Sequence, residues 1–405
     1  MSAPAPRVEP GPPLTSAQVS RYSRHLLVPG MGLEAQRRLL AARVAVVGAG
    51  GLGSPVIAYL AAAGVGHLTV IDDDVVDVTN LQRQVIHRSD AVGTAKGESA
   101  AGFARGLNPD VTVAVRHTRI DADNATELLA GHDVVLDGAD NFPTRYAVSD
   151  ACVELGIPMV WAAVLRFDAQ VATFVPGVPD AVSLRDLFPV PPRPEHVPSC
   201  SEAGVLGALV GQVGSIMAAE AVKLICGFGE PLVGRVLLID SLTQRTREIP
   251  LRPAGAVLAP VEREPVRDVV PLRELSPTDV RDLLAGSPPP PTGPSPSPPS
   301  VARGCSQGDQ TSSVVAPPVL LDVREPAEHE LGTVPGALRV PVGEVLSWDG
   351  LDQLPEGPVV VYCKAGPRAE RAAAHLVRLG HPDISVMSGG MLGWIEQVDP
   401  SLPTY

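Results

Sequence analysis

Short apolar segments alternate with longer amphipathic segments through the first part of the chain. The short segments are rich in Val and Ile and bounded by polar residues, which is typical of buried strands; they cover residues 43–47, 67–71, 111–115, 134–136 and 159–164. The segments between them are predicted to be helices and cover residues 54–63, 91–106, 125–130 and 145–155. This alternation predicts an α/β domain built on an open, largely parallel, doubly wound sheet of the Rossmann-like class.

The pattern changes after residue 251 and predicts a second, smaller α/β domain. Two further strands, at 237–240 and 246–250, are expected to close the first domain. Residues 272–285 have helical periodicity with Ser276 as N-cap, and strand and helix signals resume at residue 319. We therefore predict a disordered N-terminus at 1–13, a first domain at 14–251, a linker at 252–270 and a second domain at 271–405.

A low-complexity segment lies inside the predicted second domain. Residues 287–300 are almost entirely Pro, Ser, Thr and Gly, a composition that buries too little apolar surface to fold. We therefore predict a disordered insertion at about residues 287–316.

Composition narrows the range of partners and compartments. A net charge of -13 argues against binding to nucleic acid or to anionic membranes, whose phosphates repel such a surface, and favours basic segments on a protein partner. Five cysteines without close pairs fit a reducing compartment. The proline-rich start lacks the features of a signal peptide, so a cytoplasmic protein is expected. Charged residues interrupt the apolar stretch at 203–225, which favours a buried helix over a membrane span.

A glycine-rich turn follows the first predicted strand. Gly48, Gly50 and Gly53 allow a tight turn, close backbone approach and close helix packing, so that a helix N-terminus faces a phosphate. Asp72 ends the next strand, where an acid can bond ribose hydroxyls. These features alone fit an NAD-dependent dehydrogenase as well as an ATP-dependent enzyme.

The residues that follow favour nucleotidyl transfer. Arg83 and Lys96 supply two cations and Asp140, beside Asn141, supplies a carboxylate, all in loops after strands. Attack of a carboxylate on a phosphate brings two anions together, so such a site needs cations and a metal-binding carboxylate. Hydride transfer has no need for this set.

At this point the first domain resembles a known family. Arg21-Tyr22-Ser23-Arg24, residues 48–54, residues 80–84, Asp140-Asn141 and Pro198-Ser199-Cys200 are similar to the ubiquitin-activating-type adenylyltransferases of molybdopterin and thiamine biosynthesis, over about residues 14–251. The resemblance implies ATP-dependent adenylation of the C-terminal glycine of a ubiquitin-like sulfur-carrier protein ending in Gly-Gly. It assigns ATP binding to Gly48, Gly50, Gly51, Gly53, Asp72, Thr79, Asn80, Leu81, Gln82, Arg83, Lys96, Asp140 and Asn141.

The resemblance also implies a metal, a dimer and a reactive thiol. Asp140 would hold the magnesium that accompanies ATP. Arg24 corresponds to an arginine that reaches into a partner subunit's site, which implies a homodimer. Cys200 stands where relatives often have a cysteine able to attack an activated carboxylate; a buried structural cysteine is the alternative interpretation.

The second domain carries a cysteine at a strand-to-helix loop. Cys363 follows an apolar strand and precedes Lys364-Ala365-Gly366-Pro367-Arg368, where backbone N–H groups favour a thiolate. Residues 276–394 resemble rhodanese domains, whose loop cysteine carries a persulfide. Phosphatases with a cysteine-to-arginine loop have one more residue between the two, which makes that activity the minor alternative.

Together the two domains predict a two-step enzyme. The first domain adenylates the carrier, and Cys363 supplies sulfur received from a persulfide donor such as a cysteine desulfurase, or from thiosulfate, to give a thiocarboxylate. Carriers of molybdopterin, thiamine, cysteine and tRNA-thiolation pathways all fit. The alternatives are an adenylyltransferase with a vestigial rhodanese-like domain, an NAD-dependent dehydrogenase, and a non-catalytic scaffold for sulfur-relay proteins.

The sequence also predicts that the protein holds no zinc. Relatives usually carry two C-x-x-C pairs, but Ser183 and Asp186 occupy the places of the first pair, and no cysteine lies between Cys226 and Cys305. Four tetrahedral ligands cannot be assembled from what remains. Elemental analysis of the dialysed protein is expected to find less than one zinc per chain; stoichiometric zinc would contradict this.

Overall fold

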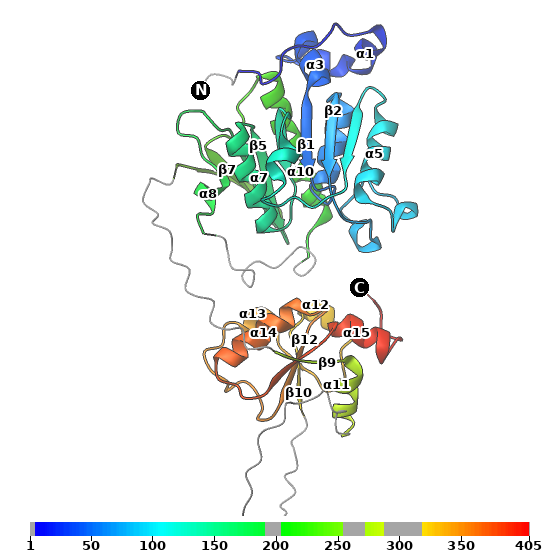
Figure 1. The fold of residues 1–405 in the computed structure, drawn as a ribbon, viewed down its shortest axis with the longest axis vertical. Helices are drawn as coiled ribbons and strands as arrows, with labels where there is room; N and C mark the ends of the chain where they lie inside the picture. Colours follow the sequence, from blue (N-terminus) through cyan, green and yellow to red (C-terminus); the bar gives the residue numbers. More distant parts are fainter. Residues whose placement is uncertain (1–4, 191–203, 254–271, 287–317, 405) are drawn as a thin grey trace, which may run out of the picture. The chain divides into compact units, whose positions relative to one another are not determined.

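The computed structural model describes residues 5–190, 204–253, 272–286 and 318–404. The chain forms two compact units, Met1–Val261 and Glu262–Tyr405 (Figure 1). Cys200, the predicted insertion at 287–316 and nearly all of the predicted linker at 252–270 lie outside the described residues.

The first unit is built on one mixed sheet with the order β3-β2-β1-β4-β5-β6-β7-β8. The strands are β1 (Arg43–Val47), β2 (His67–Ile71), β3 (Thr112–Arg116), β4 (Val134–Asp137), β5 (Met159–Leu165), β6 (Asp168–Phe174), β7 (Arg235–Asp240) and β8 (Arg245–Pro250). β1 to β5 pair in parallel, and β6 to β8 extend the sheet antiparallel. The predicted doubly wound fold is confirmed, whereas β6 was not predicted.

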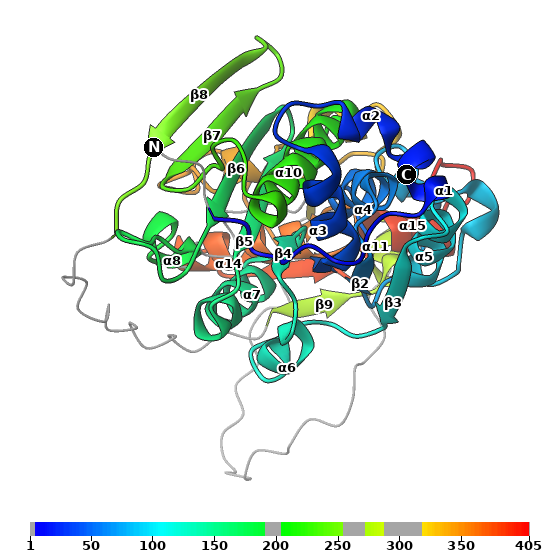
Figure 2. The ribbon, with the colours of Figure 1, turned by 90° about the horizontal axis from the view of Figure 1, so that it is seen from above.

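Helices cover both faces of this sheet (Figure 2). One face carries α3 (Gly32–Ala41), α4 (Gly53–Ala63), α5 (Lys96–Leu107) and α10 (Gly207–Cys226), and the other carries α6 (Ala125–Leu129), α7 (Phe142–Leu155) and α8 (Leu184–Leu187). The remaining helical turns are α1 (Ser16–Arg21), α2 (Ser23–Leu26), η1 (Val78–Asn80) and η2 (Ser89–Ala91).

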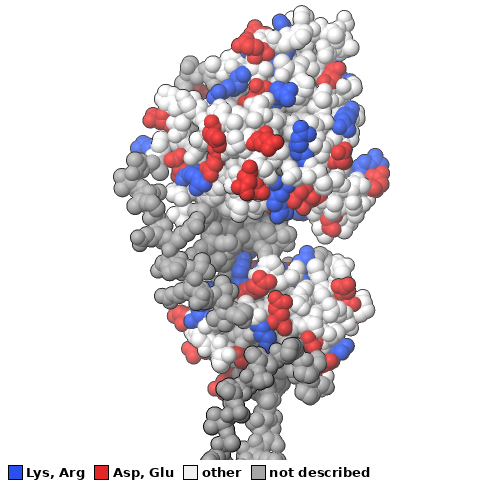
Figure 3. Space-filling model, viewed as in Figure 1, with Lys and Arg blue, Asp and Glu red and all other residues white. Residues whose placement is uncertain are grey.

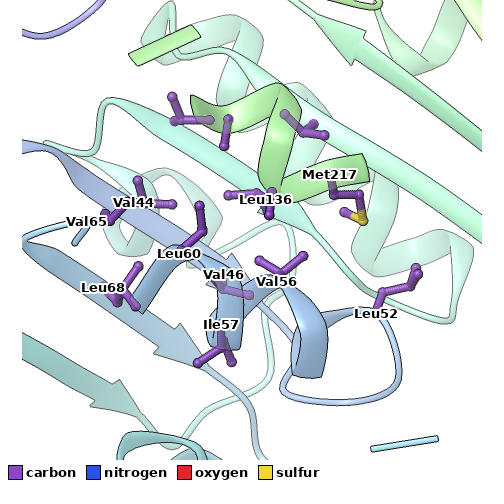
Figure 4. Packing of buried hydrophobic residues seen from close by; sticks show 14 of the residues in the cluster. Val44, Val46, Leu52, Val56, Ile57, Leu60, Val65, Leu68, Leu136 and Met217 are labelled. Atoms are coloured by element: carbon purple, nitrogen blue, oxygen red, sulfur yellow. The ribbon is translucent and has the colours of Figure 1, made fainter. Parts of the chain in front are cut away.

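The core of the first face forms between β1, α4 and α10 (Figure 4). Val46, Val56, Leu60 and Met217 are at most 1% exposed. Burying each such side chain contributes about 1.5–3 kcal/mol, and this packing presses α4 against the sheet. Gly64 then ends α4 in the left-handed conformation, at φ 83°.

Among the described residues, α10 alone is long and apolar enough to cross a membrane. It packs instead against α4, β5 and α3, and Val213, Met217 and Ala221 on it are buried. Its buried face therefore makes it a core helix of the first unit, as the interrupting charges predicted.

The described part of the N-terminus differs from the expected disorder. Val8 is 7% exposed, and the Arg7 N–H donates to the Leu224 carbonyl at 3.1 Å. Arg38 also donates to the Val8 carbonyl, at 2.6 Å. The prediction of disorder at 1–13 is therefore wrong for residues 5–13, because contacts distant in sequence hold this proline-rich segment.

The places of the absent C-x-x-C pair form a helix cap. Ser183 N–H and Oγ both donate to the Asp186 carboxylate, at 2.7 and 2.9 Å, which closes a capping box on α8. Phe188 follows α8, and its ring packs edge-on against Phe142 and Trp161. A cap and an aromatic cluster therefore fix this segment.

The second unit has a five-stranded parallel sheet with the order β11-β10-β12-β13-β9. Its elements are β9 (Arg273–Leu275), α11 (Pro277–Leu284), β10 (Val319–Asp322), α12 (Pro326–His329), β11 (Leu338–Arg339), α13 (Val342–Val345), β12 (Val359–Tyr362), α14 (Pro367–Arg378), β13 (Ile384–Met387) and α15 (Gly390–Gln397). Ser276 caps α11 as predicted. The expected helical start at 272–275 is wrong, because β9 occupies this segment and pairs with β13.

Acidic and basic side chains are interspersed over the face of each unit that Figure 3 shows.

Candidate active site

A pocket of about 370 Å³ opens in the first unit where β1 and β4 end side by side. This is the point at which the strand order reverses, where doubly wound sheets bind their ligands. The pocket collects most of the predicted nucleotide-binding residues: Gly48, Gly50, Gly51, Asp72, Asn80, Arg83, Lys96, Asp140 and Asn141.

The glycine loop after β1 has the geometry that its sequence predicted. Gly48 has φ 84°, which a residue with a side chain rarely adopts. A Cβ on Gly53 would overlap the Gly48 carbonyl oxygen, so only glycine lets α4 start this close to the loop. Gly53 thus acts through packing and does not itself line the pocket.

Asp72 fixes the glycine loop from the neighbouring strand. Its carboxylate accepts hydrogen bonds from the N–H groups of Ala49, at 2.7 Å, and Asp74, at 2.9 Å. Burial raises the pKa of Asp72 above its ordinary value, and these two hydrogen bonds oppose the rise. Asp72 therefore has a structural role in addition to the predicted place in the pocket.

Two cations enter the pocket from different elements. Lys96 is the first residue of α5, is 6% exposed, and donates from Nζ to Asp74 Oδ2 at 3.0 Å. Arg83 donates to the Thr79 carbonyl at 3.1 Å, and its Cδ lies 3.7 Å from the place of a Cβ on Gly51. Both cations therefore stand beside the glycine loop, and Lys96 has a carboxylate partner that the sequence did not assign.

Asp140 and Asn141 form the opposite wall. Asn141 caps α7 by accepting the Thr144 N–H at 3.0 Å, and its amide donates to Asp140 Oδ1 at 3.3 Å. Asp140 is exposed to the pocket, so its carboxylate retains lone pairs for a ligand. A carboxylate of this kind, together with phosphate oxygens, suits magnesium.

Four other predicted residues do not line the pocket. Thr79 bonds Asp77 through its hydroxyl at 2.6 Å, and the Gln82 backbone lies against Gly207. Leu81 precedes Gln82 in the sequence. Arg24 is exposed on α2. Thr79, Leu81 and Gln82 therefore belong to the segment beside Asn80 and Arg83, and Arg24 does not line the pocket of the single chain.

The structure adds residues that line the pocket or hold its loops in place. Asp137, at the end of β4, accepts the Ala139 N–H at 3.0 Å, and Arg145 donates to the Ala139 carbonyl at 3.1 Å. Burial raises the pKa of Asp137 to about 6. Gln84 is buried against Gly50, and Arg119 pairs with Asp73 at 3.2 Å. Gln84 and Asp137 stand in or beside the predicted motifs, whereas the pairing of Arg119 with Asp73 joins residues distant in sequence. Gln84, Arg119 and Arg145 line the pocket, and Asp137 holds the loop that lines it.

The second unit places Cys363 between β12 and α14. Its Sγ accepts the Gly366 N–H at 3.1 Å, and the side chain is buried. Pro367 is the first residue of α14, where a helix leaves its N–H unpaired in any case, so the loop has one donor fewer without cost to the helix. The N–H of Met391 holds the Cys363 carbonyl at 2.8 Å.

Buried ion pairs support this loop. Arg324 pairs with Asp322 at 2.6 Å, and Tyr362 donates to Asp322 at 2.7 Å. Arg368 forms two bonds to Glu328, at 2.6 and 2.8 Å. Burial opposes ionisation of Glu328, but the bonds from Arg368 hold the pKa of Glu328 below its ordinary value. Arg324 and Asp322 therefore form a buried structural ion pair at the end of β10.

The other described cysteines are structural. Cys152 and Cys226 are both buried, and burial raises the pKa of each thiol, that of Cys226 to about 12. Burial therefore disfavours the thiolate of both, and they serve as small apolar side chains of the core.

Comparison with known proteins agrees with both units. The ThiF family model matches residues 22–256, and the rhodanese-like domain model matches residues 307–397. A probable adenylyltransferase/sulfurtransferase MoeZ of Mycobacterium tuberculosis (strain ATCC 25618 / H37Rv) is 39% identical over 403 residues, which cover 99% of this chain and 98% of the relative. The adenylyltransferase and sulfurtransferase MOCS3 of Drosophila sechellia is 36% identical and covers 97% of this chain and 86% of its own.

Two further comparisons cover a part of the chain. The SAMP-activating enzyme E1 of Haloferax volcanii is 53% identical over 239 residues, 59% of this chain and 87% of the relative. The crystal structure of E. coli MccB with MccA-N7isoASN has a TM-score of 0.53 and 23% identity, and the match covers 60% of this chain and 74% of that one. This second likeness shows a shared fold.

The fold and pocket define a nucleotide-binding α/β transferase with a second, sulfur-transfer unit. The chain belongs to the ThiF family and carries a rhodanese-like domain. This confirms the predicted family and replaces the dehydrogenase and scaffold alternatives with an adenylyltransferase/sulfurtransferase class.

The buried carboxyl of Asp137 predicts a pH-dependent stability. Its pKa rises from 3.8 unfolded to about 6 folded, so the folded state binds the proton more tightly between these values. This group's contribution to the free energy of unfolding therefore falls as pH rises from about 4 to about 6, by up to about 3 kcal/mol. In urea unfolding, the free energy of unfolding of Asp137→Asn should increase relative to that of the wild type as pH rises from about 4 to about 6. A difference in the free energy of unfolding between Asp137→Asn and the wild type that stays constant from about pH 4 to about pH 6 would contradict this.

Proposed function

We propose that this enzyme uses ATP to adenylate the C-terminal glycine of a ubiquitin-like sulfur-carrier protein and then converts it to a thiocarboxylate. The observation that supports this most is the single pocket in which Lys96, Arg83 and Asp140 surround a glycine loop. That combination suits two anions reacting beside a metal. The relatives' names, adenylyltransferase and sulfurtransferase, support both steps.

In the first step, a glycine carboxylate oxygen attacks the α-phosphorus of ATP. A bond forms from this oxygen to phosphorus, and the bond to the bridging oxygen breaks, so that pyrophosphate leaves and a carrier adenylate remains. Lys96 and Arg83 offset the charge that collects on the phosphate oxygens, and the glycine loop binds phosphate through its N–H groups. Asp140 would hold magnesium, which supplies further charge neutralisation on the phosphates when bound.

In the second step, the terminal sulfur of a Cys363 persulfide attacks the adenylated carbonyl and displaces AMP. The product is an acyl disulfide between carrier and Cys363. A second thiol, assigned from the sequence to Cys200, attacks the Cys363 sulfur; the carrier leaves as a thiocarboxylate, and the disulfide between the cysteines is reduced by an external thiol. A protein persulfide from a cysteine desulfurase, or thiosulfate, reloads Cys363.

The remaining assignments belong to the same proposal. Arg24 is exposed, as expected of a residue that completes the site of a partner subunit in a homodimer. The name of the Haloferax relative, an activating enzyme, supports a small carrier protein as substrate. We place the enzyme in the cytoplasm and in molybdopterin or thiamine biosynthesis.

Replacement of Asp140 tests the first step. Asp140→Ala should reduce carrier-dependent ATP–pyrophosphate exchange at least about 100-fold, because magnesium and its charge neutralisation are lost at the phosphates. Asp123→Ala, an exposed aspartate away from the pocket, is the matched control and should exchange normally. Exchange at the control rate by Asp140→Ala would remove Asp140 from the site.

Replacement of Cys363 separates the two steps. Cys363→Ala should exchange pyrophosphate at the wild-type rate, because the nucleotide pocket lies in the other unit, yet form no thiocarboxylate from a persulfide donor. Mass spectrometry of the carrier measures the product, and Cys226→Ala serves as the control. Thiocarboxylate formed at the wild-type rate by Cys363→Ala would support the alternative of a vestigial rhodanese-like domain.

A further inference from the structure

His87 is a buried histidine that joins the glycine loop to α5. The side chain is 6% exposed and does not line the pocket. Its Nε2 lies 2.9 Å from the Ala49 carbonyl oxygen, and its Nδ1 lies 2.9 Å from the hydroxyl of Ser99. Both ring nitrogens therefore have partners, and one of these partners is the loop that the phosphates would contact.

The partners of His87 determine its tautomer. A carbonyl oxygen only accepts hydrogen bonds, so Nε2 carries a proton. Burial lowers the pKa of His87, which favours the neutral ring. The Ser99 hydroxyl then donates to Nδ1 and keeps the proton on Nε2, so His87 is a fixed donor to the Ala49 carbonyl.

This hydrogen bond also sets the direction of the next N–H. The Ala49 carbonyl and the Gly50 N–H belong to one planar trans peptide and point to opposite sides. Gly50 lines the pocket, and its N–H has no hydrogen-bond partner among the residues that the structure describes. By holding the carbonyl, His87 turns this free donor away from itself and fixes its direction.

The loop after β4, which lies beside the glycine loop and also lines the pocket, repeats the arrangement. Ala49 is held at N–H by Asp72 and at the carbonyl by His87. Ala139 is held at N–H by Asp137 and at the carbonyl by Arg145. Each loop thus has its central peptide groups fixed by one carboxylate and one nitrogen donor, at the ends of neighbouring strands.

We propose that His87 is a positioning residue for adenylation, which holds the Ala49–Gly50 peptide so that the Gly50 N–H donates to a phosphate of ATP. The inference rests on the proposed ATP-dependent function. The phosphates are bound both in the ground state and in the transition state. Loss of the His87–Ala49 hydrogen bond should therefore weaken ATP binding in both states and raise KM for ATP more than it lowers kcat.

Two amide substitutions separate this role from simple packing. The amide nitrogen of Gln reaches about as far as Nε2 of His87 and can still donate to the Ala49 carbonyl. The amide of Asn reaches only as far as Nδ1, so it can contact the Ser99 hydroxyl but not the Ala49 carbonyl. In carrier-dependent ATP–pyrophosphate exchange, His87→Asn should raise KM for ATP about five- to tenfold, the value of one hydrogen bond, with kcat within about twofold. His87→Gln should stay within about twofold of the wild type in both constants.

His132 provides the matched control. It is also a histidine of the first unit whose pKa is lowered by burial, with Nδ1 at 3.0 Å from a carbonyl, that of Leu129, and Nε2 at 2.8 Å from a hydroxyl, that of Thr69. It does not line the pocket or contact the glycine loop. His132→Asn should lower the midpoint of thermal unfolding and leave KM for ATP unchanged.

The outcomes distinguish this inference from the proposed function. Unchanged KM in His87→Asn, or an equal rise in His87→Asn and His87→Gln, would overturn the positioning role. If the wild type shows no carrier-dependent exchange, the proposed function fails. The Kd of a fluorescent ATP analogue then tests the role of His87: it should rise about five- to tenfold in His87→Asn and stay within about twofold in His87→Gln. If His87→Asn does not fold, His87→Met, which has a length close to that of Gln but no donor for the Ala49 carbonyl, must raise KM for ATP above that of His87→Gln, or the inference is wrong.

Discussion

The contact between Gly53 and the carbonyl of Gly48 is the constraint on which the nucleotide site depends. It lets α4 begin directly under the glycine loop, because any side chain at Gly53 would overlap that carbonyl. The buried face of α4, with Val56 and Leu60, then holds the helix against β1. Core packing therefore positions the loop N–H groups and the start of α4, and the loop is held as firmly as the close-packed core beneath it.

Charge is arranged around this loop in pairs that the fold holds in place. Lys96 stands at the start of α5 with Asp74 beside it, so the cation is nearly buried yet compensated. Asp140 stands on the facing wall, exposed to the pocket. Two cations and an exposed carboxylate thus line one pocket beside the glycine loop, and charges fixed in this way are preorganised.

The second unit also positions its predicted reactive group, the Cys363 thiol, on a strand-to-helix loop. Cys363 lies at the end of a buried strand with its Sγ held by the Gly366 N–H. The Arg324–Asp322 pair bonds Tyr362 just before the loop, and Glu328 pairs with Arg368 just after it. Removal of one partner from such a buried pair would leave an uncompensated charge, so these pairs specify the loop's shape. In both units, the predicted functional residues stand on or beside a strand-to-helix loop.

The sequence by itself determined the alternation of strands and helices, the glycine turn and the set of cations and carboxylate, because periodicity and turn chemistry are local properties. The tertiary structure decided what depends on distant partners. β9 has three residues, too few to show a period, and forms because β13 pairs with it. Residues 5–13 look disordered by composition, but Leu224 and Arg38 hold them. Likewise His87 acts on the glycine loop only when folding brings it to the Ala49 carbonyl, since no local pattern marks a residue that holds a distant peptide.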